Sequence, residues 1–156
     1  MKLLSATIAA ALTLLVPSDA QSDPQAISKD TARKAIELFC ANPLSEDADG
    51  AASIILKFAE ASSDIHITIT VKALPWFNNP TPVKHSQQLL GAFLAGNVKS
   101  QLTTGTAKND PYAGVLQVIA TYRQIQKREP DFKLAEVEHL IELANQKKLK
   151  EHLETP

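Results

Sequence analysis

The chain has 156 residues with a formal net charge of −1, and 44% of its residues are hydrophobic while 21% are charged. This is enough apolar material for one domain with one core. The mixed and nearly balanced charge excludes the strongly basic class of nucleic-acid-binding proteins, so we predict no nucleic-acid partner.

Residues 1–20 have the layout of a secretory signal peptide. Met1 and Lys2 form a short positive start, and residues 3–16 are apolar or small. Ser18 and Ala20 then place small side chains at the −3 and −1 positions of a cleavage site. The apolar run is shorter than the about 20 residues of a transmembrane helix. We predict cleavage after Ala20, export, and no membrane association of the mature form. The alternative is a buried N-terminal helix of the mature fold.

The cysteine content favours a bacterial protein. Cys40 is the only cysteine, which excludes an internal disulfide, and no Asn-x-Ser/Thr glycosylation site occurs because Asn79 is followed by Pro80. Small secreted eukaryotic domains usually contain several cysteines. We predict a bacterial periplasmic or extracellular protein in which Cys40 is a small core residue rather than a catalytic thiol.

After a flexible stretch over residues 21–27, hydrophobic periodicity predicts a single helical domain over residues 28–154. Capping and helix-breaking residues delimit its elements. The predicted helices cover residues 28 or 30 to 42, 45–63, 81–105, 111–129, 134–144 and 146–153. The predicted fold class is mainly α, a compact bundle of four to six helices.

The third of these helices, over residues 81–105, is predicted to be central. Its residues 89–96 are apolar or small on every side, as expected for a helix that is buried all round. Small residues recur four positions apart, as Gly91 with Ala95 and Ala92 with Gly96. This spacing predicts a close approach by neighbouring helices.

Residues 64–72 break the helical pattern. Four β-branched residues, Ile65, Ile67, Ile69 and Val71, alternate with polar ones, which predicts one isolated extended or β segment. Its backbone needs hydrogen-bond partners. Three arrangements are open: pairing with an irregular strand around residues 132–134, pairing between two copies of the chain in a homodimer, or an extended segment lying on the helices. We favour the first or the third.

The loop that follows contains the only tryptophan, Trp76, next to Phe77, and prolines on both sides make it rigid. Two interpretations are open. The pair can fill the open end of the bundle as a hydrophobic plug, or it can form an exposed docking surface for a partner.

Polar residues interrupt one face of the central helix. Ser86, Asn97 and Gln101 lie near Leu90 on that face, and buried amides need partners. The natural candidates lie on the next helix, and they are Tyr112, Tyr122, Arg123 and Gln126. One interpretation is a structural hydrogen-bond network. The other is a small-ligand pocket built from Ser86, Asn97, Gln101, Tyr112, Tyr122 and Arg123.

Glu136, His139 and Glu142 are spaced three residues apart, as in a carboxylate-bridged metal site on a helix. A dinuclear site needs the Glu-x-x-His motif twice, and the chain has it once, so we predict no metal and no cofactor. His85 and Ser86 are adjacent in a predicted helix, where side chains point about 100° apart. We therefore predict no catalytic residue.

These observations favour an exported noncatalytic helical protein that acts through contact with a protein partner. The alternative is a small-ligand-binding module that uses Asn97, Gln101 and Tyr122. An enzyme of unrecognised type is the third hypothesis.

Overall fold

The computed structural model describes residues 26–155, so the predicted signal peptide and residues 21–25 of the predicted flexible stretch lie outside the described residues. Residues 26–155 form six α-helices and one 3₁₀ helix, with no strand. The predicted mainly α, compact bundle is confirmed. The helices are α1 (Lys29–Ala41), α2 (Ala48–Ala61), the 3₁₀ helix η1 (Pro75–Asn78), α3 (Ser86–Thr104), α4 (Pro111–Arg128), α5 (Ala135–Asn145) and α6 (Leu149–Glu154).

Local capping residues set several helix ends where the sequence predicts them. The Ser28 hydroxyl accepts a hydrogen bond from the backbone N–H of Thr31 (3.1 Å) at the start of α1. Asp110 does the same for Ala113 (3.0 Å) at the start of α4. Gly105 ends α3 in the left-handed conformation (φ 69°), which glycine adopts without a steric penalty.

The predicted starts of α2 and α6 were wrong. Ser45 does not cap α2, because its hydroxyl donates instead to the carbonyl oxygen of Asn42 (2.9 Å), and the helix begins at Ala48. The terminal helix begins at Leu149 rather than at residue 146, since the chain turns at Lys147 with a positive φ of 60°.

The start of α3 was predicted five residues too early. The helix begins at Ser86 rather than at Thr81, and the residue before it, His85, is left-handed (φ 59°). The chain makes a turn before the helix instead, in which the backbone N–H of Ser86 donates to the carbonyl oxygen of Val83 (3.1 Å).

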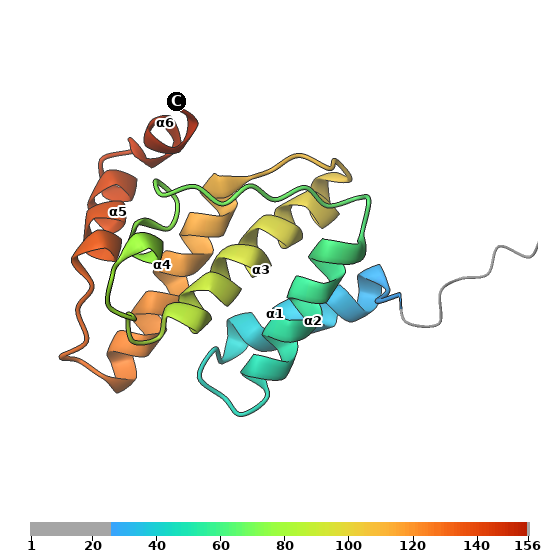
Figure 1. Ribbon diagram of the computed structural model, residues 1–156, viewed down its shortest axis with the longest axis horizontal. Coiled ribbons are helices and arrows are strands. Elements are labelled where there is room, and N and C mark those ends of the chain that lie inside the picture. The colour runs from blue at the N-terminus through green and yellow to red at the C-terminus, as the bar shows by residue number, and fades with distance from the viewer. Residues whose placement is uncertain (1–25, 156) are drawn as a thin grey trace, which may run out of the picture.

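Helix α3 runs through the middle of the molecule (Figure 1). It packs against α4 on one side and against α1 and α2 on the other, while α5 and α6 pack on α4. Residues 91–98 of α3 are all buried. The prediction of a central helix surrounded by others is confirmed. No helix in residues 26–155 combines the length and the hydrophobicity of a transmembrane segment.

Glycines permit the closest helix contacts. A Cβ atom added to Gly96 would overlap the carbonyl oxygen of Ala113 on α4, and one added to Gly114 would lie 2.6 Å from the ring of Phe93. On the opposite side of α3, a Cβ atom at Gly91 would lie 3.0 Å from the Phe39 ring of α1. The small residues of α3 therefore set its distance from helices on both sides.

Candidate functional site

Asn97 and Gln101, the polar pair of the central helix, are buried, with exposed fractions of 0% and 2%. The Asn97 amide nitrogen donates to Asn109 Oδ1 (2.8 Å). The Asn97 amide oxygen accepts from Gln101 Nε2 (2.7 Å) and from the backbone N–H of Asp110 (3.2 Å). These bonds join the C-terminal half of α3 to the loop that precedes α4.

The Gln101 side chain pairs with the backbone of His66 as a neighbouring strand would. Gln101 Oε1 accepts from the His66 N–H (2.9 Å), and Gln101 Nε2 donates to the His66 carbonyl oxygen (2.8 Å). The N–H of Thr68 donates to Asn109 Oδ1 (3.1 Å). Residues 65–70 form neither helix nor strand, and amide side chains supply these backbone partners.

Tyr122 and Gln126, two of the predicted partners of Asn97, bond instead to α5 and to the turn before it. The buried Tyr122 hydroxyl donates to Glu138 Oε1 (2.7 Å) and accepts from the backbone N–H of Leu134 (3.1 Å). Gln126 Nε2 donates to the carbonyl oxygen of Phe132 (3.2 Å). Burial raises the pKa of the Tyr122 phenol above its ordinary value. These bonds fix α5 on α4.

The remaining residues of the predicted ligand pocket lie apart from the amide pair. Ser86 is half-buried at the start of α3, while Tyr112 and Arg123 are exposed on α4. The structure thus joins Asn97 and Gln101 to each other and to Asn109. It does not join them to the tyrosines or to Arg123.

The two aromatic residues of the predicted docking surface separate. Trp76 is 2% exposed and belongs to the core, whereas Phe77 is 55% exposed. The indole Nε1 of Trp76 is the one buried side-chain polar atom without a hydrogen-bond partner among residues 26–155. Of the predicted pair, Phe77 is therefore the exposed member.

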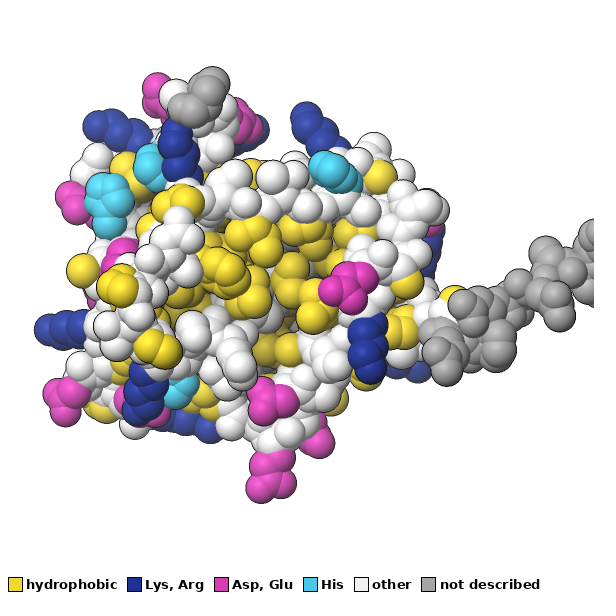
Figure 2. Space-filling model, in the orientation of Figure 1, with side chains coloured by type: hydrophobic (Ala, Val, Ile, Leu, Met, Phe, Trp, Pro, Cys, Tyr) yellow, Lys and Arg dark blue, Asp and Glu magenta, His cyan; other side chains and the backbone are white. Residues whose placement is uncertain are grey.

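Phe77 lies in a stretch that exposes two further large hydrophobic side chains, Ile69 (45%) and Val71 (54%). We call these three residues the 69–77 surface. Elsewhere in the molecule, hydrophobic side chains also reach the surface in the middle of the face shown in Figure 2, over α3 and between α2 and the segment that precedes η1.

A pocket of about 470 Å³ adjoins the 69–77 surface, between the chain near Val71 and helices α5 and α6. Val71, Pro75 and Leu140 give it apolar walls, and His139 and His152 both line it. The two imidazole rings lie edge to face, with their centroids 6.2 Å apart. Sequence spacing did not predict this histidine pair, because the turn between α5 and α6 brings the rings together.

Glu136, His139 and Glu142, which have the sequence spacing of a helical metal site, do not form a metal-binding cluster. Among residues 26–155, no group of three or more histidine, cysteine, aspartate or glutamate side chains is placed to hold a metal ion. Glu136 accepts a hydrogen bond from the Asn79 amide (2.9 Å), and Glu142 accepts one from the Gln146 amide (3.0 Å). These carboxylates therefore serve as surface hydrogen-bond acceptors.

Glu129 links the end of α4 to the residues just before the start of α3. Its carboxylate accepts from Lys84 Nζ (2.5 Å) and contacts His85 Nε2 (3.1 Å), just before α3 begins. The His85 ring packs edge-on against Phe132, with centroids 5.1 Å apart. The hydrogen bonds from Lys84 and then His85 hold the pKa of the Glu129 carboxyl below its ordinary value near 4.5.

We expect Glu129→Gln to lower the melting temperature by a few degrees at pH 7, since this partly exposed pair contributes modestly. A carboxyl whose pKa is depressed by folding stabilises the protein above its unfolded pKa, and loses this effect as pH falls. The difference between wild type and Glu129→Gln should therefore disappear in thermal melts well below pH 4.5. Glu60→Gln, an exposed change on α2, is the control. An equal difference at pH 3 and pH 7 would contradict this.

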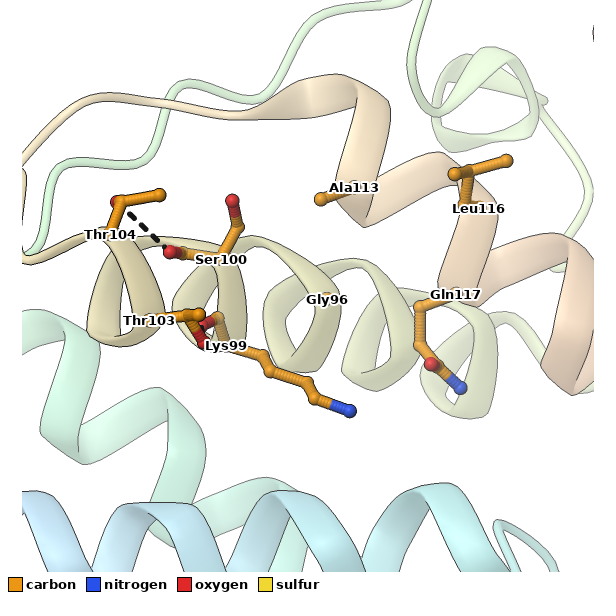
Figure 3. A pocket seen from close by; sticks show the side chains of 8 residues that line it. All are labelled: Gly96, Lys99, Ser100, Thr103, Thr104, Ala113, Leu116 and Gln117. Carbon is orange, nitrogen blue, oxygen red and sulfur yellow. Dashed lines mark hydrogen bonds between the residues drawn. The ribbon is translucent and has the colours of Figure 1, made fainter.

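A shallow groove lies between α3 and α4 where Gly96 faces Ala113 (Figure 3). Ser100 and Thr104 project from one side of α3, and Lys99 projects from the other side of the same helix. The Thr104 hydroxyl is bonded to the Ser100 carbonyl oxygen (3.0 Å). The groove follows the contact line between the two packed helices. Ser100 and Thr104 also line a second, deeper cleft near the end of α3.

No family model, curated protein or solved structure matches this chain. We therefore argue its function from its own residues.

Proposed function

We propose that this protein is an exported, noncatalytic helical protein that binds a protein partner through the 69–77 surface. The observation behind the proposal is the concentration of exposed Ile69, Val71 and Phe77 in one connecting segment. Large apolar side chains grouped on a surface mark interaction sites more often than scattered ones do.

The neighbouring pocket supports the same proposal. Val71 belongs both to the 69–77 surface and to the pocket, so an apolar side chain of a partner could enter the pocket while its backbone lies along the segment. Aromatic and aliphatic anchors in such pockets supply much of the energy of protein interfaces. The histidines at the pocket add donors and acceptors at its rim.

Hydrogen bonds and a buried side chain hold the 69–77 segment in a fixed position, as partner binding favours. Gln101 and Asn109 bond the backbone just before it, at His66 and Thr68, and the buried Trp76 anchors its far end. A binding segment that is already ordered loses less conformational entropy when the partner binds. The ligand-binding alternative has less support, because the amides of Asn97 and Gln101 are occupied by internal bonds.

Site-specific photo-crosslinking tests this proposal in cells that naturally make the protein. A benzophenone amino acid would replace Phe77 in one variant and Leu56 in the other. Leu56 is a matched control, because it is 42% exposed on α2 and lies outside the 69–77 surface. We expect ultraviolet light to produce one adduct of defined mass at position 77 and none at position 56. No adduct, or the same adducts from both positions, would contradict the proposal.

A further inference from the structure

A second site is separate from the 69–77 surface. A cleft of about 560 Å³ lies where the end of α3, the loop over residues 105–110, the start of α4 and α6 meet. It shares no lining residue with the histidine pocket. Its size falls within the range of about 300–1,000 Å³ that is common for small-molecule sites. We call it the polar cleft.

The polar cleft is rich in hydroxyl groups. Ser100 and Thr104 come from α3, Thr106 from the loop, and the Tyr112 phenol from α4. The Thr104 and Thr106 hydroxyls are 2.8 Å apart, and the Ser100 hydroxyl donates to Asp110 Oδ2 (2.5 Å). Each hydroxyl can donate one hydrogen bond and accept two, so these groups retain capacity for a ligand.

Charges in the polar cleft balance. Lys108 and Lys150 line it together with Asp110 and Glu154, which gives two formal charges of each sign. Lys150 lies 3.9 Å from Glu154, and Asp110 also caps α4. A strongly anionic or cationic ligand would meet like charges as well as opposite ones. The arrangement therefore favours a neutral ligand that uses the charged groups as hydrogen-bond partners.

Tyr112 adds a flat apolar surface beside these polar groups. Its side chain is 38% exposed, and Leu153 lines the same cleft from α6. Sugars present one face of C–H groups together with a rim of hydroxyls, and an aromatic ring next to donors and acceptors satisfies both. An entirely apolar ligand would leave the polar groups of the cleft unpaired, which is costly.

Hydrogen bonds to the helix core support part of the lining of the polar cleft. Asn109 and Asp110 line the cleft, and the buried Asn97 bonds to the Asn109 side chain and to the Asp110 backbone N–H. A site whose polar groups are fixed by supporting hydrogen bonds binds its ligand with less reorganisation. The buried amide network thus supports the polar cleft without forming part of it.

We infer that the polar cleft binds a small neutral polyhydroxylated ligand of the size of a mono- or disaccharide, held by stacking on Tyr112 and by hydrogen bonds to the surrounding hydroxyl, amide and charged groups.

Titration calorimetry and saturation-transfer NMR with the purified full domain test this inference. The probes are glucose, N-acetylglucosamine, maltose and trehalose, with glucuronate and glucosamine as charged comparisons. We expect saturable binding of at least one neutral sugar. Tyr112→Ala should weaken it about fivefold to tenfold, because the stacking surface is lost, whereas Tyr112→Phe should retain most of it. Leu116→Ala is the matched control, since Leu116 is 40% exposed one turn further along α4 and does not line the polar cleft.

Melting curves of the three variants separate loss of the site from loss of the fold. The inference is overturned if no neutral sugar binds, if glucuronate or glucosamine binds in preference, or if Tyr112→Ala and Leu116→Ala weaken binding equally. None of these outcomes affects the 69–77 surface, which shares no residue with the polar cleft.

Discussion

Gly96→Ala is expected to lower the melting temperature by roughly 10 °C, one of the largest effects of any single-methyl change in this chain. The added Cβ would overlap the carbonyl oxygen of Ala113, a backbone atom of the neighbouring helix that cannot rotate aside. Overpacking of this kind costs roughly 1–3 kcal/mol. A backbone clash belongs at the upper end of that range, against a total free energy of unfolding of about 5–15 kcal/mol.

Gly50→Ala provides the matched control, because it is the same chemical change in another helix. Gly50 lies in α2, and a Cβ added there has nothing within 4 Å. Replacing glycine by alanine at such a helical position should stabilise the protein, by up to about 1 kcal/mol. Thermal melts should therefore move in opposite directions for the two variants. A rise for both would show that α3 and α4 are not in close contact at Gly96.

The sequence predicts helix ends where the signal is local. Ser28, Asp110 and Gly105 act within a few residues of themselves, and the structure places each at the predicted cap. The small residues of α3 likewise predict close helix contact. The predicted start of α3 was wrong because Thr81 and Pro82 carry the local signals of a helix start, whereas the chain makes a further turn over residues 83–86 before the helix begins.

The partners of the buried amides could not be read from the sequence. Helical periodicity shows that Asn97 and Gln101 share a face, but their partners are His66 and Asn109, which lie outside the helices. A side chain that bonds the backbone of a distant segment leaves no pattern in its own neighbourhood. The predicted partners Tyr112, Tyr122 and Arg123 lie on the next helix. The hydrogen-bonding groups of Asn97 are instead occupied by Asn109 and Asp110, in the loop before that helix.

The division between Trp76 and Phe77 has a similar cause. Adjacent aromatic residues in a proline-rich loop have the same local signal, and only the turn of η1 decides that one ring enters the core while the other faces solvent. The contact between His139 and His152 depends on the left-handed turn at Lys147. Candidate sites in connecting segments are therefore predicted less well than helices.

Asn97→Leu is expected to lower stability by about 1–3 kcal/mol, with Asn97→Ala at least as damaging. Asn97 makes three hydrogen bonds at 0% exposure, so either change leaves the Asp110 N–H without its partner and weakens the support of Asn109. Leucine restores volume but supplies no donor or acceptor. Asn145→Leu, the same change on the exposed end of α5, should leave the melting temperature within about 2 °C of wild type.

A double-mutant cycle with Gln101→Leu makes this prediction more specific. Because Gln101 Nε2 donates to Asn97 Oδ1 (2.7 Å), the two substitutions should not add, and the double variant should lose less free energy than the sum of the single ones. Hydrogen exchange at the His66 amide should also accelerate when Gln101 is replaced, since that amide loses its acceptor. If Asn97→Leu instead leaves the melting temperature unchanged or raises it, the amide is bonded to water in the free protein. The ligand-pocket hypothesis for Asn97 and Gln101 would then replace the structural one.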